Sequence, residues 1–123
     1  MIEVATDPAR KRVIAHMAGM LTVADVARFS EKQQAAVHRM GLKSGEYDLL
    51  ILAEGNLVQT KEVMEAFASL VLNSPVKAGK MATVRDGVLT RMQSRRMANL
   101  HGSAEVFANL EEAEAWLAHE RDT

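Results

Sequence analysis

The chain has 123 residues, enough for one domain with its own hydrophobic core. Its 15 basic and 16 acidic residues leave a formal net charge of −1, so no overall field draws it toward nucleic acid or an anionic membrane. The absence of cysteine excludes disulfides, thiol chemistry and zinc sites with thiolate ligands. The N-terminus lacks signal-peptide features, and the longest apolar run, Leu49 to Ala53, is too short to span a bilayer. We therefore expect a cytoplasmic protein.

The N-terminal third predicts a β-hairpin followed by a helix. Ile2 to Thr6 and Arg12 to Met20 each alternate apolar and other residues, and turn-forming residues lie between them. Thr22 has the position of an N-cap for a helix that ends at Gly41. The predicted inner face of this helix consists of Val26, Phe29, Ala36, Val37 and Met40. Gln33 is a polar residue on the same face.

The central third predicts a buried strand followed by a second helix. Tyr47 to Ala53 contains an unbroken apolar run, which is typical of a strand covered on both faces in a parallel sheet. Thr60 begins the helix, and Asn73-Ser74-Pro75 ends it. Its predicted inner face consists of Val63, Phe67, Leu70 and Val71.

The last third predicts a strand, a helix, a strand and a final helix. Met81 to Val84 is the first of these strands, and Ala104 to Phe107 is the second. Asn109 can cap the final helix, with Glu112 completing a capping box. The intervening helix runs from Val88 to Leu100, and its predicted inner face consists of Val88, Leu89, Met92 and Leu100.

The order of these elements is ββαβαβαβα. After the hairpin each strand is followed by a helix of ten residues or more, which requires crossover connections and a mostly parallel sheet with helices packed against it. The sequence contains no linker or repeat. We therefore expect a single α/β domain, residues 1–123, with a mixed, mostly parallel sheet of five strands and four helices.

Several motifs resemble the SpoIIAA-like branch of the STAS (anti-anti-sigma factor) superfamily. They are Val106-Phe107-x-x-Leu110-Glu111-Glu112-Ala113-x-x-Trp116-Leu117, Met20-Leu21-Thr22 before the first helix, and Ser74-Pro75 after the second. The resemblance covers nearly the whole chain and implies the same fold, without a common enzymatic activity. It also implies a similarity in fold to lipid-carrying CRAL-TRIO domains.

The classical branch of that superfamily is phosphorylated on a Ser or Thr in an Asp-x-Ser-Gly type loop after the third strand. Here the matching stretch, Ala53 to Thr60, contains no Ser. Asn56 stands nearest the phosphoacceptor position and cannot be phosphorylated, while Thr60 is displaced to the helix cap. We do not expect a phosphorelay.

The loop from Glu54 to Thr60 is the first candidate site. Gly55 and Asn56 follow a buried strand and precede a helix N-terminus, where open α/β sheets bind ligands and free N–H groups favour anions. An ordinary strand-to-helix turn, capped by Thr60, accounts for the same residues. Partners of the wider superfamily meet this region, which makes Asn56 and Leu57 candidate partner contacts.

The second candidate site is an apolar space between helices. Eight methionines are many for this length, and flexible thioethers serve either as core filler or as the lining of a pliable cavity. Met64, Phe67 and Met92 are its candidate lining residues. Helical spacing places Arg96 beside Met92, where a guanidinium either reaches solvent or meets an acidic headgroup in a pocket.

Other chemistry finds little support. Arg91, Arg95 and Arg96 lack the interleaved aromatic residues of a nucleic-acid site, so we expect no nucleic-acid partner. The histidines lack metal-ligand spacing, so we predict no metal and no cofactor. No nucleophile or phosphate-loop motif occurs, so we predict no enzyme.

The sequence thus favours a non-enzymatic binding or regulatory domain. Its partner is either a small apolar or amphipathic, lipid-like ligand, with peripheral membrane contact as an extension, or a protein bound at the helix faces. Two further hypotheses are a switch phosphorylated at Thr60 and an enzyme without a recognisable motif. Edge strands also leave a homodimer open.

Overall fold

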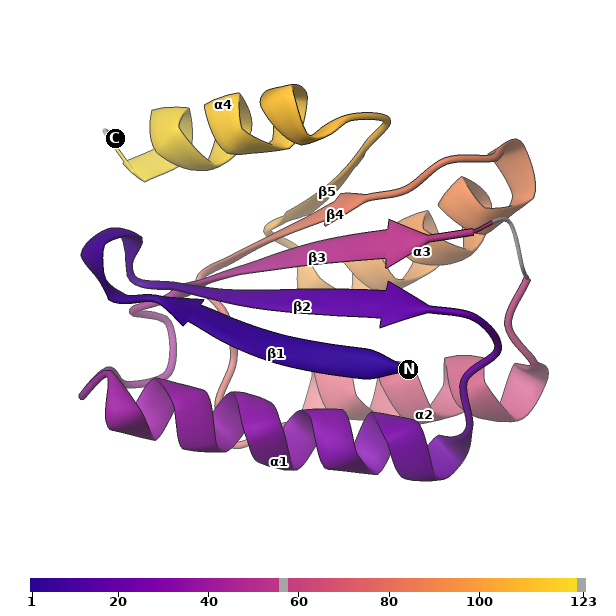
Figure 1. Cartoon of the computed structure of the whole chain (residues 1–123), viewed down its shortest axis with the longest axis horizontal. Coiled ribbons are helices and arrows are strands. Elements are labelled where there is room, and N and C mark those ends of the chain that lie inside the picture. Colours follow the sequence, from indigo (N-terminus) through magenta and orange to yellow (C-terminus); the bar gives the residue numbers. More distant parts are fainter. Residues whose placement is uncertain (56–57, 122–123) are drawn as a thin grey trace.

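The computed structural model describes residues 1–55 and 58–121. The strands and helices in these ranges follow the predicted order (Figure 1). They are β1 (Ile2–Asp7), β2 (Arg12–Ala18), α1 (Val23–Arg39), β3 (Asp48–Glu54), α2 (Lys61–Asn73), β4 (Lys80–Val84), α3 (Val88–His101), β5 (Ala104–Phe107) and α4 (Leu110–Arg121).

The sheet has the order β1-β2-β3-β4-β5, the same as the order along the chain. Only β1 runs antiparallel to its neighbour, and all the other pairs are parallel. The predicted α/β class with a mixed, mostly parallel sheet is therefore confirmed. β2 to β5 all end at the same edge of the sheet, which we call the carboxyl edge. The chain also starts there, because the N-terminal ammonium of Met1 donates to the carbonyl of Ala18 at 2.8 Å.

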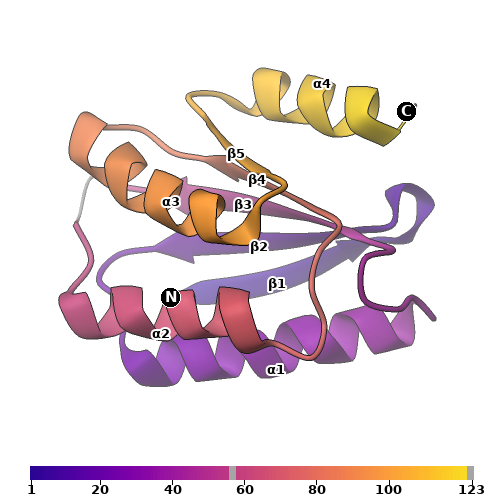
Figure 2. The ribbon, with the colours of Figure 1, turned by 180° about the vertical axis from the view of Figure 1, so that it is seen from behind.

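The helices form unequal layers. α1, α2 and α3 cover one face of the sheet, and α4 lies alone on the other (Figures 1 and 2). Because side chains alternate along a strand, Leu49 and Ile51 of β3 join the core under α1 and α2, while Leu50 and Leu52 join the core under α4. The unbroken apolar run is thus buried from both sides, as the sequence predicts.

α4 is fixed by both apolar and polar contacts. Leu117 is 0 % exposed and packs with Leu50 in the smaller core. Arg12 of β2 donates to Glu114 at 2.6 Å, an ion pair whose guanidinium is almost fully buried. These contacts anchor α4 over β2 to β5, and no other helix of the described residues lies on that face.

Side-chain caps set three of the four helix starts, as predicted. The side chain of Thr22 accepts from the N–H of Asp25 at 3.1 Å, and the carboxylate of Asp25 accepts from the N–H of Thr22 at 2.9 Å. The hydrogen bond from the Thr22 N–H lowers the pKa of the Asp25 carboxyl, and Arg28 lowers it further. Thr60 accepts from the N–H of Val63, and Asn109 from that of Glu112. α3 is the exception, because it starts at Gly87 with no side-chain cap.

The predicted inner face of α3 is wrong. Val88 and Leu89 are 69 % and 65 % exposed, and Met92 and Leu100 also face solvent. The buried residues of this helix are instead Thr90 and Ala98. The prediction assumed that apolar burial sets the rotation of the helix about its axis, whereas α3 is held by hydrogen bonds from its polar residues, described below.

The observed rotation of α3 predicts that substitution by alanine lowers the free energy of unfolding much less at Leu89 than at Leu117. We expect Leu89→Ala to change the free energy of unfolding by less than about 0.5 kcal/mol, because the side chain is largely solvated. Leu117→Ala, which empties a fully buried position, should cost about 2–5 kcal/mol. Urea denaturation of the two variants measures both values, and a cost at Leu89 equal to that at Leu117 would contradict the rotation of α3.

Candidate functional site

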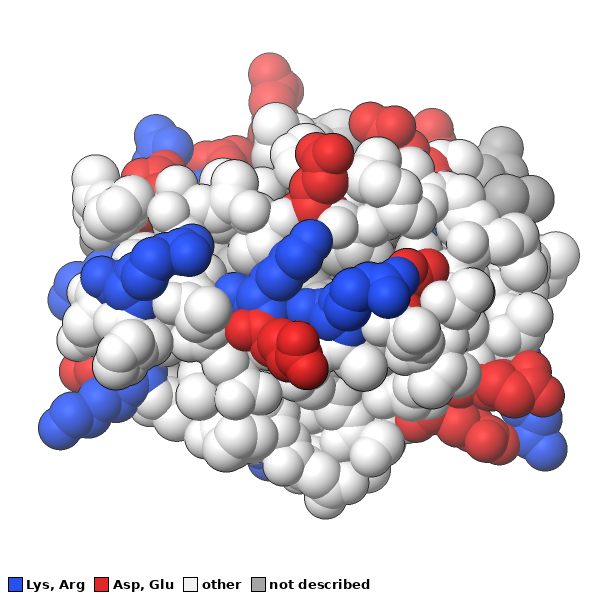
Figure 3. Space-filling view, turned by 60° about the horizontal axis from the view of Figure 1, so that its bottom comes forward, with Lys and Arg blue, Asp and Glu red and all other residues white. Residues whose placement is uncertain are grey.

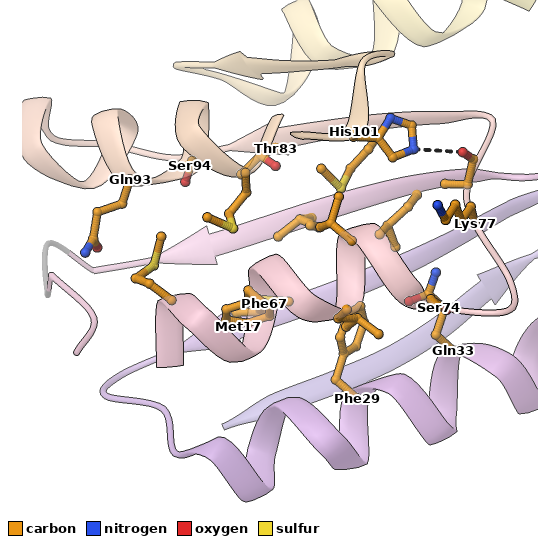
Figure 4. Close-up of a pocket in the computed structure, with 18 of the residues that line it drawn as sticks. Met17, Phe29, Gln33, Phe67, Ser74, Lys77, Thr83, Gln93, Ser94 and His101 are labelled. Carbon is orange, nitrogen blue, oxygen red and sulfur yellow. Dashed lines mark hydrogen bonds between the residues drawn. The ribbon is translucent and has the colours of Figure 1, made fainter. Parts of the chain in front are cut away.

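A cavity of about 100 Å³ lies between α2, α3 and the sheet (Figure 4). Met17, Leu49, Ile51 and Met81 form its floor on three adjacent strands. Its walls come from the helices, and they include Phe29, Met64, Phe67, Leu70, Val71, Ser94 and Met97. The cavity is therefore mainly apolar, with its walls provided by helices that are far apart in sequence.

The cavity exists because α3 presents small or flexible side chains to the sheet. The residues turned inward recur at helical spacing: Thr90, Gln93, Ser94, Met97, Ala98 and His101. Phe67 and Met64 of α2 line the opposite wall, so the wall that faces them carries a serine and a methionine rather than a row of large aliphatic groups. Protein interiors are normally packed with few voids larger than a water molecule, so this space is a distinct feature of the chain.

Gln59 links three segments at the carboxyl edge. Its buried side chain accepts from the N–H of Leu21 at 2.9 Å and donates to the carbonyl of Gly19 at 3.0 Å. Its backbone makes two hydrogen bonds with the side-chain amide of Gln93, at 2.9 and 3.1 Å. These bonds connect the loop before α1, the loop before α2 and the first half of α3.

His101 fastens the other end of α3. Its Nε2 lies 2.8 Å from the carbonyl of Ala78, and its Nδ1 lies 3.1 Å from the N–H of Ser103 (Figure 4). A backbone N–H must donate, so Nδ1 is the acceptor and the ring proton sits on Nε2. The imidazole is thus neutral in this arrangement, and both of its nitrogens are used to hold the chain in place.

Gln33, the polar residue in the predicted apolar stripe of α1, has a partner in the core. Its amide donates to the hydroxyl of Tyr47, whose side chain is fully buried. Burial disfavours the phenolate and raises the pKa of Tyr47 to about 12, although the hydrogen bond from Gln33 acts in the opposite direction. The pair explains how a glutamine can occupy a core position at the rim of the cavity.

The sequence-predicted site residues divide into three groups. Met64 and Phe67 line the cavity, as expected for an apolar space between helices. Thr60 caps α2 and is exposed, Glu54 is exposed at the end of β3, and Gly55 follows with a φ of +89°. Asn56 and Leu57 lie outside the described residues.

Met92 and Arg96 form the third group. Both side chains are exposed, and they do not line the cavity. They are one helical turn apart, as predicted, but on the outward side of α3. Of the two alternatives for Arg96, the structure therefore agrees with the one in which the guanidinium reaches solvent, and the alternative in which it points into a pocket is wrong.

Sequence reasoning missed the polar residues of the site, namely Gln59, Thr83, Arg85, Gln93, Ser94 and His101. One signal was available in α3, where small or hydrogen-bonding residues recur at Thr90, Ser94, Ala98 and His101 and form their own stripe. The partners of Gln59 are distant in sequence, and no local pattern indicates them.

No three His, Asp or Glu side chains in residues 1–55 and 58–121 gather closely enough to hold a metal ion. Every helix in the same ranges is too short or too polar to cross a bilayer.

Comparison with known proteins supports the fold. No protein-family model matches the sequence, and no curated protein matches it. A solved structure does: an uncharacterised DUF3478-family protein with a SpoIIAA-like fold from Shewanella loihica PV-4. The two share 19% sequence identity with a TM-score of 0.69, over 95% of this chain and 92% of the other.

The chain has a SpoIIAA-like fold. At 19% identity this likeness concerns the fold and says nothing of a ligand. The similarity to CRAL-TRIO domains stays a prediction.

The SpoIIAA-like domain gathers exposed apolar side chains at one end. Among the described residues, all the exposed large apolar side chains except Leu72 and Leu100 lie on or near the loops of the carboxyl edge. We call this set the apolar end: Met1, Met20, Val23, Val58, Val88, Leu89, Met92 and Leu110. By contrast, the face with α1 and α2 carries basic and acidic side chains close together (Figure 3).

Tyr47 allows a direct test of the packing beside the cavity. It is the only tyrosine, so the ultraviolet absorbance of tyrosinate reports on this residue alone. We expect a titration midpoint near 12 in the folded domain, against 10.0 for an ordinary tyrosine. A folded-state midpoint near the ordinary value would contradict the burial.

The same shift predicts a loss of stability at high pH. The unfolded chain loses the Tyr47 proton near its ordinary pKa of 10.0, while the folded domain keeps it up to about 12. The stabilisation is complete below pH 10 and is lost as the pH rises toward 12, by about 2–3 kcal/mol. Tyr47→Phe should remove this component from the pH dependence.

Proposed function

We propose that this domain is a non-enzymatic binding domain that holds a small apolar or amphipathic ligand between α2, α3 and the sheet. The observation that carries the proposal is the cavity itself, which has a volume of about 100 Å³ and a mainly apolar lining. An engineered cavity of about 150 Å³ lined by Leu, Ile and Phe stays dry and binds benzene. A space of similar lining and somewhat smaller volume suits a small aliphatic molecule.

The polar groups around the cavity support binding rather than catalysis. His101 uses both ring nitrogens for hydrogen bonds to the backbone, and the ammonium of Lys77 donates to the carbonyl of Leu72 at 3.0 Å. No Asp or Glu is among the described residues that line the space. A general base would need a titratable group free to exchange protons with a substrate, and these groups are engaged in structure.

The volume of the cavity limits how much of a lipid-like ligand can fit inside it. A long acyl chain exceeds about 100 Å³, so only one end of it fits while α2 and α3 keep their present separation. A longer ligand requires α3 to move away from α2, which would break the hydrogen bonds of Gln93 or His101. The structure therefore favours a short ligand, or the end of a longer one.

A cavity-filling substitution tests the ligand proposal. In the unchanged protein we expect members of a panel of fatty acids, alcohols and small lipids to raise the melting temperature in a concentration-dependent way. Ser94→Leu, which fills the space, should abolish that rise, whereas Arg95→Leu on the exposed side of α3 should retain it. Native mass spectrometry that finds no bound small molecule, together with no thermal shift across the panel, would refute the proposal.

A second candidate function is a protein-interaction module related to anti-anti-sigma factors, without their phosphoserine loop. The apolar end favours it, because large apolar side chains that gather on one part of a surface mark interaction sites. Val58 of this end belongs to the loop from Glu54 to Thr60, and the resemblance to the STAS superfamily implies that partners meet this loop. Contact with a membrane surface is a further hypothesis. It is supported by Arg91, Arg95 and Arg96, which lie on a helix without any carboxylate.

Charge placed in the apolar end tests this second candidate. The double variant Val58→Lys and Leu89→Lys should weaken a specific protein pull-down at least about tenfold, because each lysine must be desolvated at the contact. Leu72→Lys on α2, equally apolar and exposed but elsewhere, is the matched control. Vesicle co-sedimentation and light scattering distinguish membrane contact and homodimerisation from binding of a different protein. Indifference of the pull-down to the double variant would exclude the apolar end as the contact.

A further inference from the structure

β1 is an edge strand that pairs with a single strand, β2, among the described residues. The pairing is one residue to one residue from Ile2 to Asp7, so β1 carries no bulge. It contains no proline, and with six residues it is not unusually short. Bulges, prolines and very short strands are three of the means by which an edge is kept from pairing with another chain. β1 uses none of these three.

The hydrogen bonds between β1 and β2 show which backbone groups of β1 point away from the sheet. Met1 and Ala18 exchange two hydrogen bonds, at 2.8 and 2.9 Å. Such pairs recur at every second residue of an antiparallel ladder, so the N–H and C=O groups of Glu3 and Ala5 also point toward β2. The groups of the residues that alternate with them point outward, and we call these the open groups of β1: Ile2, Val4 and Thr6.

A strand added to this edge would place half of its side chains over α1. The side chains of Ile2 and Val4 face the core under α1 and are only partly buried there. Residues that exchange hydrogen bonds across an antiparallel pair direct their side chains to the same face of the sheet. The residues of an added strand that pair with the open groups would therefore point toward α1, and would complete the cover of Ile2 and Val4.

α1 presents basic side chains at that position. Arg28, Lys32 and Arg39 are exposed and share one flank of the helix, which we call the basic flank. Ala27 and Ser30 line a groove between α1 and α2, so α2 lies against the opposite flank. Because α1 lies beneath β1 at the edge of the sheet, the basic flank faces outward past β1 (Figure 1). Figure 3 shows basic side chains in a row across this side of the molecule.

The basic flank carries more positive than negative charge. The one acid on the same flank of α1, Asp25, accepts from Arg28 at 2.6 Å. Glu31 is adjacent to Lys32 in sequence and therefore points about 100° away from it. Residues four apart on a helix are separated by about 6 Å along its axis, and alternate residues of a strand by about 6.6 Å. Acidic side chains at alternate positions of an added strand therefore match the spacing of Arg28 and Lys32.

We propose that β1 binds an extended segment of a partner protein, with acidic side chains at alternate positions, as an additional strand of the sheet. The backbone of the segment pairs with the open groups of β1, and its acidic side chains meet the basic flank. Its remaining side chains lie on the other face, where the exposed carboxylate of Glu3 disfavours further acids. This surface is separate from the cavity, so the inference goes beyond the proposed ligand and does not depend on it.

Charge also argues against a second copy of this chain as the occupant. Antiparallel pairing of two β1 strands would place both α1 helices on the same face of a continuous sheet. The two basic flanks would then lie next to each other, and like charges at close range repel.

The probe is a capped peptide in which glutamate and threonine alternate over the length of β1. Two comparison peptides have lysine in place of glutamate, or N-methylated glutamates that keep the charge but lose the N–H donors. In chemical-shift titrations of the full chain we expect the probe to bind at least about tenfold more tightly than either. At saturation, hydrogen exchange at the amides of Ile2, Val4 and Thr6 should slow at least about tenfold, because these N–H groups become paired.

Reversal of charge tests the basic flank separately from the backbone. The double variant Lys32→Glu and Arg39→Glu should abolish the preference for the acidic peptide, and both residues are exposed, so the fold is retained. Lys61→Glu with Arg95→Glu makes the same change in net charge on α2 and α3 and should leave the preference intact.

Four outcomes would overturn the inference. They are equal affinity for acidic and basic peptides, no binding of the acidic peptide, and binding without slower exchange at the three amides, which would show charge attraction alone. The fourth is slow exchange at these amides without peptide, together with a dimer in light scattering, which would place a second copy on the edge. None of the four affects the proposal for the cavity.

Discussion

The burial of β3 from both sides is the constraint on which the rest of the architecture depends. Leu49 and Ile51 require cover on one face of the sheet, and Leu50 and Leu52 require it on the other. Parallel neighbours supply that cover, since each crossover carries a helix. Three helices share one face, and the single helix of the other face is secured by the ion pair between Arg12 and Glu114. The uneven layers, and therefore the position of the cavity among three helices, follow from this arrangement.

Hydrogen bonds, rather than the burial of apolar side chains, set the rotation of α3 about its axis. Its large side chains, Val88, Leu89 and Met92, would bury more apolar surface if the helix were turned about its axis. The hydrogen bonds of Gln93 and His101 hold it in the opposite sense. As a result, α3 turns small and polar side chains toward the core and large apolar side chains toward solvent. This orientation leaves a cavity in the core and an apolar area on the molecular surface.

Sequence patterns predicted the elements well because the signals are local or strictly periodic. The run from Leu49 to Leu52 indicates a doubly buried strand by itself, and caps such as Thr22 and Asn109 act within three residues. The candidate site was predicted only in part. Phe67 belongs to the regular stripe of α2 and Met64 lies one helical turn before it, whereas Gln59 and Gln93 meet across 34 residues of sequence through amide geometry that no periodicity encodes. The error at α3 arose where local amphipathicity and tertiary hydrogen bonding disagree, and the cavity occurs at the same place.

That coincidence has a physical reason. A chain selected only for stability would place a large aliphatic residue at Ser94 and would turn Leu89 inward, since each change removes a void or an exposed apolar group. Local departures from the rules of packing are expected where function opposes stability. In this SpoIIAA-like domain the departures share one helix: its inner side borders the cavity, and its outer side contributes Val88, Leu89 and Met92 to the apolar end. A ligand that displaces α3 must therefore also move the apolar surface that the helix presents to solvent.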